Sequence, residues 1–368
     1  DSSTSRGLGD VYKRQAYQRA LELTDQPMLR SHFEGLIMRQ KLLASSADEA
    51  LVAELRAKID QLEGQAAAYP FVREYAVGLY GLGRIDEATS AIERELDNTS
   101  AGYDPEEREQ LRLLKGIILG ANSETGRASL KTLILNGRNR ETLGIALQLL
   151  ARVPNQDADL LSFLNVVLSR TEPHLLKGQT YYLRCQLAMK MAQQGSVEER
   201  VGLMAIAESD ARTLLDQFPG LSQITNVYRL LAYAALERQP AQYRAAADFL
   251  IQLRDQSRES EDFSEVNRLI GDCYFLNRDF ANAVDFYSAA HSRGEGSPRD
   301  GELFLRLISA QVRAGLIGQA SQLIDQADSS GSINQADRWR AEWNVAQALQ
   351  ASGELDPVSY THLRAHET

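Results

Sequence analysis

The sequence predicts an all-α protein, an α-solenoid made of stacked antiparallel helix pairs. Long stretches place apolar residues at positions i, i+3, i+4 and i+7, which is the pattern of an amphipathic helix. Alternating runs of β-branched residues, which would indicate strands, are almost absent. Short polar breaks such as Asn136-Gly137-Arg138-Asn139 separate the periodic segments. Short connections of this kind make consecutive helices antiparallel neighbours.

The composition limits the classes of function. The chain has 368 residues, of which 43% are apolar, and a formal net charge of −10. This acidic balance, without a basic stripe, argues against a nucleic-acid partner. No apolar run approaches the ~20 residues of a transmembrane helix, so we expect no transmembrane segment. No signal peptide is visible in the polar start, and the sequence leaves open a cytoplasmic or a periplasmic and cell-envelope location.

Residues 16–170 are expected to form the N-terminal part of the helical array. Gly83-Arg84-Ile85-Asp86-Glu87-Ala88, followed by Ile92, has the pattern of a tight turn and the second helix of a hairpin. The segment 105–170 keeps the helical rhythm, for example at Leu111, Leu114 and Ile118, but lacks the recurring small and aromatic residues. We therefore expect partly degenerate repeats here, with an undetermined register.

Residues 171–355 are expected to form the C-terminal part, with a more regular repeat. Gly271 and Tyr274 are followed by Ala283, Tyr287 and Ala290, and Ala320 lies 37 residues after Ala283. Further members of the pattern are Leu231, Ala232, Ala235, Ala246, Ala207, Ala211, Leu214, Ile324, Ala327 and the turn Gly353-Glu354-Leu355. Small residues at these spacings predict close helix crossings that larger neighbours fill.

These motifs resemble the tetratricopeptide repeat (TPR) family, in particular its bacterial members. The resemblance implies a right-handed superhelix in which the first helix of each pair lines a concave groove. It also implies a non-catalytic scaffold that binds a protein or peptide partner in that groove. Two alternatives remain open: a regulatory or sensory arm of a larger enzyme or transcriptional regulator, and an envelope lipoprotein or secretion-assembly factor.

The groove positions that the resemblance implies are spread over the repeats. They are Arg73, Tyr80, Arg229, Tyr233, Arg268, Asp272, Phe275, Leu305 and Trp343, with Val77, Leu236, Ser309, Val312 and Gln347 at further positions of the same register. Mixed arginine, aromatic and aliphatic side chains suit a peptide. The family's grip on a C-terminal carboxylate uses lysine and asparagine, and Arg268, Asp272, Leu305 and Ser309 depart from it. The competing interpretation is that these are ordinary half-buried positions.

The two ends of the chain differ from the rest. Residues 1–15 and 356–368 interrupt a repeat in the middle of its hairpin, and "DVYKRQ" and "PVSYTHLRAHET" resemble translated adapter or read-through ends of metagenome-assembled proteins. We expect both segments to be non-native tails and the chain to be a fragment, with genuine irregular termini as the alternative.

No pattern indicates catalysis, a cofactor or a metal. His362 and His366 have the i, i+4 spacing of helical zinc ligands but no third ligand nearby. Cys185 and Cys273 are interpreted as two buried thiols, with a long-range disulfide as the alternative. Asp104 is expected to cap a helix that begins at Pro105. Trp339 and Trp343 share a helix face, either as packing between repeats or as an anchor for a peptide.

Overall fold

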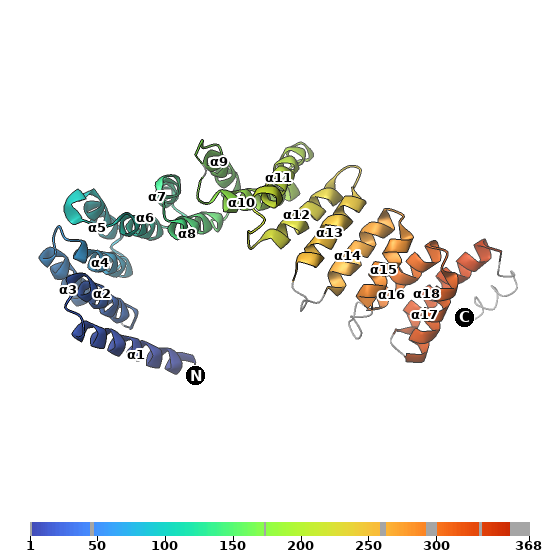
Figure 1. Ribbon diagram of the computed structural model, residues 1–368, viewed down its shortest axis with the longest axis horizontal. Helices are drawn as coiled ribbons and strands as arrows, with labels where there is room; N and C mark the ends of the chain where they lie inside the picture. Colours follow the sequence, from blue (N-terminus) through green and yellow to red (C-terminus); the bar gives the residue numbers. More distant parts are fainter. Residues whose placement is uncertain are drawn as a thin grey trace. The chain divides into compact units, whose positions relative to one another are not determined.

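The computed structural model describes residues 2–44, 48–172, 174–257, 263–291, 300–330 and 333–353. These residues form α-helices and two short 3-10 helices, and no β-strand occurs among them. Successive helices pack against each other as adjacent pairs, which confirms the predicted all-α, solenoid-like class (Figure 1). Within these ranges, no helix combines the length and the apolar character that a bilayer crossing needs. The predicted tail 356–368, with His362 and His366, lies outside the described residues.

The chain divides into two compact units, Asp1–Thr180 and Tyr181–Thr368, and the boundary falls within helix α10. The first unit contains α1 (Ser2–Glu22), α2 (Pro27–Ala44), α3 (Glu49–Gln61), α4 (Tyr69–Gly81), α5 (Ile85–Asp97), α6 (Pro105–Leu119), α7 (Glu124–Asn136), α8 (Arg140–Ala151) and α9 (Asp157–Leu168). Short 3-10 helices precede α4 and follow α5, at Ala66–Ala68 and Thr99–Ala101. Helix α1 includes both the predicted tail and the first predicted repeat residues.

The second unit contains most of α10 (Lys177–Gln194) and all of α11 (Val197–Gln217), α12 (Ile224–Glu237), α13 (Tyr243–Gln256), α14 (Ser264–Leu276), α15 (Phe280–His291), α16 (Asp300–Arg313), α17 (Ile317–Ser330) and α18 (Gln335–Ala351). From α12 onward, each helix contacts the next, and α16 also contacts α18. Figure 1 shows α12 to α16 as a row of neighbouring helices.

Small residues allow the helices of the second unit to cross closely, as the sequence predicts. Ala283, Tyr287 and Ala320 are fully or almost fully buried, and Gly271 is buried as well. A Cβ atom added to Gly271 would lie 2.6 Å from two ring atoms of Tyr287. Any larger residue at position 271 would therefore displace a buried aromatic ring.

The turns of the regular hairpins share one backbone closure. The backbone N–H of Arg84, Asp279 and Leu316 each donates to the carbonyl oxygen five residues earlier, at 2.9, 2.9 and 2.8 Å. Gly83 and Gly315 precede two of these donors and have φ near +76°, the left-handed conformation that ends a helix in this way. Arg278 has φ +63° at the equivalent position of the third turn.

The segment 105–170 forms four helices and closes one of its turns differently. Glu109 of α6 is buried, and its carboxylate accepts from the backbone N–H of Arg138 (2.5 Å) and of Asn139 (2.7 Å). These two residues connect α7 to α8. At the start of α6, Asp104 caps the helix, Pro105 is its first residue and Glu107 completes a capping box, which confirms the predicted helix start.

Candidate functional site

The predicted groove residues fall into both units. Arg73 and Tyr80 belong to α4 in the first unit; Arg73 lies 3.7 Å from Glu74, and Tyr80 is 48% exposed. The other predicted residues lie on α12, α14, α16 and α18 in the second unit, so they occupy alternate helices of the array. Four of the predicted positions, Phe275, Ser309, Val312 and Gln347, line a common hollow.

On α12, the predicted residues are partly engaged in the protein itself. Arg229 is exposed and donates to Asn226 at 3.4 Å, while the half-buried Tyr233 packs against the core of α10 to α12. Leu236, at the end of the helix, is 37% exposed. This helix therefore offers one cation and one aliphatic side chain to solvent.

On α14, Arg268 and Asp272 bind each other. The Arg268 guanidinium donates to Asp272 at 2.8 Å and also pairs with Glu265 at 2.6 Å. The Tyr287 hydroxyl donates to the other oxygen of Asp272 at 2.6 Å, and Arg306 of α16 donates to that oxygen as well. Burial and the hydrogen bond to Asp272 raise the pKa of Tyr287, so this hydroxyl remains the proton donor.

This Asp272 cluster ties α14, α15 and α16 together and occupies two of the predicted groove residues. Arg306, which also pairs with Glu302 at 2.7 Å, belongs to the cluster but is not among the predicted groove residues. Its only sequence signal is its place next to the predicted Leu305, which itself packs against the core of α16 to α18. The cluster is a structural tie, because each of its charges already faces an opposite charge.

A hollow with a volume of about 340 Å³ lies beside this cluster. Helix α14 contributes Phe275, α16 contributes Ser309, Val312 and Arg313, and α18 contributes Asn344, Gln347 and Ala348. Residues of these three helices therefore meet around one hollow. Phe275, Ser309, Val312 and Gln347 were predicted groove positions, whereas Arg313 and Asn344 were not.

The tryptophan pair lies on the same helix as part of this hollow. The rings of Trp339 and Trp343 stack with centroids 6.4 Å apart and planes at 10°. Both are half-buried in α18, and neither lines the hollow. Their mutual stacking favours a packing role over an anchor that is free to receive a ligand.

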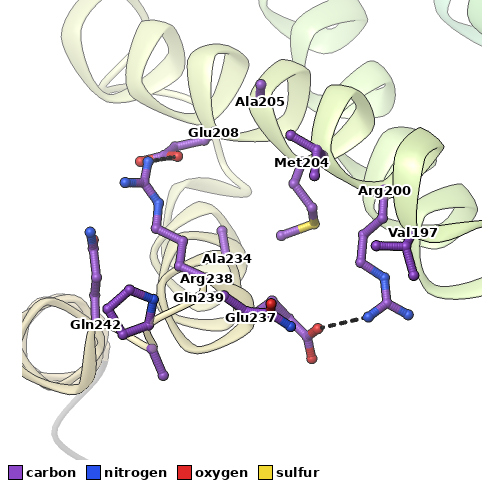
Figure 2. A pocket seen from close by; sticks show the side chains of 13 residues that line it. Val197, Arg200, Met204, Ala205, Glu208, Ala234, Glu237, Arg238, Gln239 and Gln242 are labelled. Atoms are coloured by element: carbon purple, nitrogen blue, oxygen red, sulfur yellow. Dashed lines mark hydrogen bonds and ion pairs between the residues drawn. The ribbon is translucent and has the colours of Figure 1, made fainter.

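A second hollow, of about 550 Å³, lies between the first half of α11 and the end of α12 (Figure 2). Its apolar walls include Val197, Val201 and Met204, and the two valines are 76% and 71% exposed. Ion pairs cross between the two helices: Arg200 with Glu237 at 3.7 Å, and Arg238 with Glu208. These pairs satisfy the charged groups, so this hollow offers mainly apolar contact. None of its lining residues was among the predicted site residues.

The two thiols and His174 have environments that are typical of structural residues. Cys185 and Cys273 are free and buried, which confirms the interpretation of two buried thiols; burial raises their pKa to about 12 and about 11. His174 Nδ1 accepts from the Leu176 N–H at 3.1 Å, so Nε2 donates to the Ile134 carbonyl at 2.8 Å. Among the described residues, no three histidine, cysteine or acidic side chains gather as a metal site would need.

The sequence was also compared with known proteins. No family model matches it, and no curated protein aligns with it at a significant level.

Proposed function

We propose that this protein is a non-catalytic scaffold of the TPR type, which binds a peptide or protein partner along the face formed by α12, α14, α16 and α18. One observation carries the proposal: the alternate helices α14, α16 and α18 contribute to one hollow, which four predicted groove positions help to line. A hollow shared by repeated helices suits an extended ligand, because each repeat presents equivalent positions along one line.

The chemistry of this face supports binding over catalysis. The buried thiol of Cys273 on α14 has a raised pKa, which disfavours the reactive thiolate. The strongest cluster of charges, around Asp272, is neutralised by its own partners. What remains at the surface of the hollow is a mixture of phenylalanine, aliphatic, amide, hydroxyl and guanidinium groups, which is typical of peptide recognition.

Site-specific photocrosslinking tests the proposal. A photoreactive amino acid at Val312 is expected to capture a protein from a bacterial lysate, whereas the same residue at the exposed Asp285 of α15 is not. A third position, Val201, probes the hollow between α11 and α12. Capture at Val201 or Asp285 alone, with none at Val312, would contradict the assignment of the groove face.

A further inference from the structure

The Arg313 guanidinium is held in place by two aromatic rings. Its central carbon lies 5.4 Å from the centre of the Phe275 ring and 5.6 Å from that of Phe280. The two rings meet edge to face with centroids 5.3 Å apart. Cation–π contact with this pair of adjoining rings restricts the flexible arginine side chain and reduces the entropy that binding a ligand would cost.

Arg313 differs from the other arginines that lie over aromatic rings. Arg184 pairs with Asp210, Arg244 with Asp248 and Asp279, and Arg254 with Asp255. Arg108 donates to three backbone carbonyl groups. The guanidinium of Arg313 has no hydrogen bond or ion pair within the described part of the chain. Its planar set of N–H donors therefore faces the hollow and solvent without an acceptor.

The neighbouring polar side chains of the hollow also have unused hydrogen-bonding groups. Among the described residues, the side chains of Ser309, Asn344 and Gln347 have no hydrogen-bond partner, and no acidic side chain lines the hollow. The nearby Asp272 is neutralised by Arg268 and Arg306. The hollow thus combines one uncompensated positive charge with hydroxyl and amide groups that can bond a peptide backbone.

We propose that this hollow binds an acidic side chain of an extended peptide, with the carboxylate held in a bidentate manner by Arg313. The inference rests on the proposed function and specifies its partner: a segment with a glutamate or aspartate flanked by small residues. A carboxylate and a guanidinium match in geometry and charge, which makes this pair stronger than neutral hydrogen bonds. The hollow of about 340 Å³ has room for this side chain and adjoining backbone.

The test uses the full chain and two acetylated, amidated nonapeptides of alanine and serine, one with a central glutamate and the other with a central glutamine. Binding is followed by nuclear magnetic resonance of the arginine Nε–H groups. The glutamate peptide is expected to shift the Arg313 signal saturably, with a Kd at least about tenfold lower than that of the glutamine peptide. Equal affinity of the two peptides, or no saturable shift, would overturn the inference without the use of any variant.

Three variants sharpen the result. Arg313→Gln is expected to weaken binding of the glutamate peptide at least about tenfold, and Arg313→Lys to weaken it less, because it keeps the charge but loses the planar fork. Arg244→Gln is the matched control, since Arg244 also lies over a ring, at 5.2 Å from Tyr274, but already has acidic partners. If Arg313→Gln changed only the stability of α16 and not the affinity, the arginine would be structural and the inference wrong.

A glutamine peptide with a free C-terminus distinguishes the source of the carboxylate. If this peptide bound better than the amidated glutamate peptide, the ligand would be a chain terminus and not a side chain. The crosslinking experiment is independent of these peptides. Capture at Val312 together with failure of the glutamate peptide would reject the acidic ligand alone, whereas failure of capture would reject the proposed function.

Discussion

In the α14–α15 hairpin, a tyrosine ring packs against a helical glycine; in the α6–α7 hairpin, a leucine does the same. A Cβ atom added to Gly116 would lie 2.6 Å from Leu130 Cδ2, as one added to Gly271 would lie 2.6 Å from the Tyr287 ring. Leu130 follows Gly116 by 14 residues, and Tyr287 follows Gly271 by 16 residues. The close crossing is thus preserved where the sequence signature is absent, and only the filling side chain and its spacing differ.

The two regions also differ in the range of the contacts that close their turns. The α14–α15 turn is closed by its own backbone, through the bond from Asp279 to Tyr274. The α7–α8 turn depends on Glu109, a side chain from the helix before, some 30 residues away. A turn that is closed by its own backbone recurs with the repeat, so it can be recognised in the sequence. A turn that is closed by a side chain from another helix has no such recurring pattern. We therefore expect the segment 105–170 to be more sensitive to single substitutions in its turns.

The largest effect is expected for Glu109→Ala. The substitution leaves two backbone N–H groups without their charged acceptor, and each such bond contributes about 1.5–3 kcal/mol. We expect the free energy of unfolding to fall by roughly 3 kcal/mol or more, measured by urea unfolding, with faster hydrogen exchange in α7 and α8. The exposed Glu106→Ala, on the same helix, is the control. If the two substitutions lowered the stability equally, the α7–α8 turn would not depend on Glu109 in the way proposed.

Next come the helical glycines. Gly271→Ala gains helix propensity of about 1 kcal/mol but forces a Cβ against the Tyr287 ring, which we expect to give a net loss of about 1–2 kcal/mol. Gly116→Ala should lose less, because the Leu130 side chain can rotate. Gly144 in α8 has no atom within 4 Å of an added Cβ, so Gly144→Ala should raise stability. If Gly271→Ala stabilised the chain as well, the crossing would not be close in solution.

Substitution of the two buried glutamates should change the free energy of unfolding in opposite directions: Glu109→Ala lowers it, whereas Glu74→Gln raises it at pH 7. Glu74 is buried, and burial raises its pKa, although the charge of Arg73 opposes the shift. Since the folded chain binds this proton more tightly than the unfolded chain, stability falls as the pH rises through the pKa of Glu74. Glu74→Gln should therefore raise stability at pH 7, by less than about 1 kcal/mol, and have no effect in acid, below about pH 4. Urea midpoints at the two pH values measure this; a loss at pH 7 would show that Glu74 acts as Glu109 does.

The smallest effect concerns the shared turn. Arg278 is exposed and holds φ +63°, where Gly315 has φ +77° in the next hairpin. A residue with a Cβ in this conformation costs about 1–2 kcal/mol, partly offset by the lower chain entropy of arginine when unfolded. We expect Arg278→Gly to raise the thermal midpoint slightly and the reverse change, Gly315→Arg, to lower it. If both substitutions shifted the thermal midpoint in the same direction, the two turns would not be equivalent.

The sequence predicted the helices and the crossings of the second unit because both depend on local periodicity and on recurring small residues such as Ala283 and Ala320. It also singled out Phe275, Ser309, Val312 and Gln347, and these four residues line one hollow. It did not predict the Asp272 cluster, nor that Arg313 has no hydrogen bond or ion pair among the described residues. Both depend on which side chains meet across three helices. Nor did it predict the hollow beside Val201, because the i, i+4 spacing of Val197 and Val201 is the same for buried and for exposed positions of a helix.

The self-closed turns have a practical consequence for the length of the protein. A hairpin whose ends are fixed by its own backbone, and whose buried side faces only its immediate neighbours, is an interchangeable unit. Duplicating residues 264–300 in frame should therefore add one more layer to the array without redesign of the rest, and would offer a direct route to longer engineered versions.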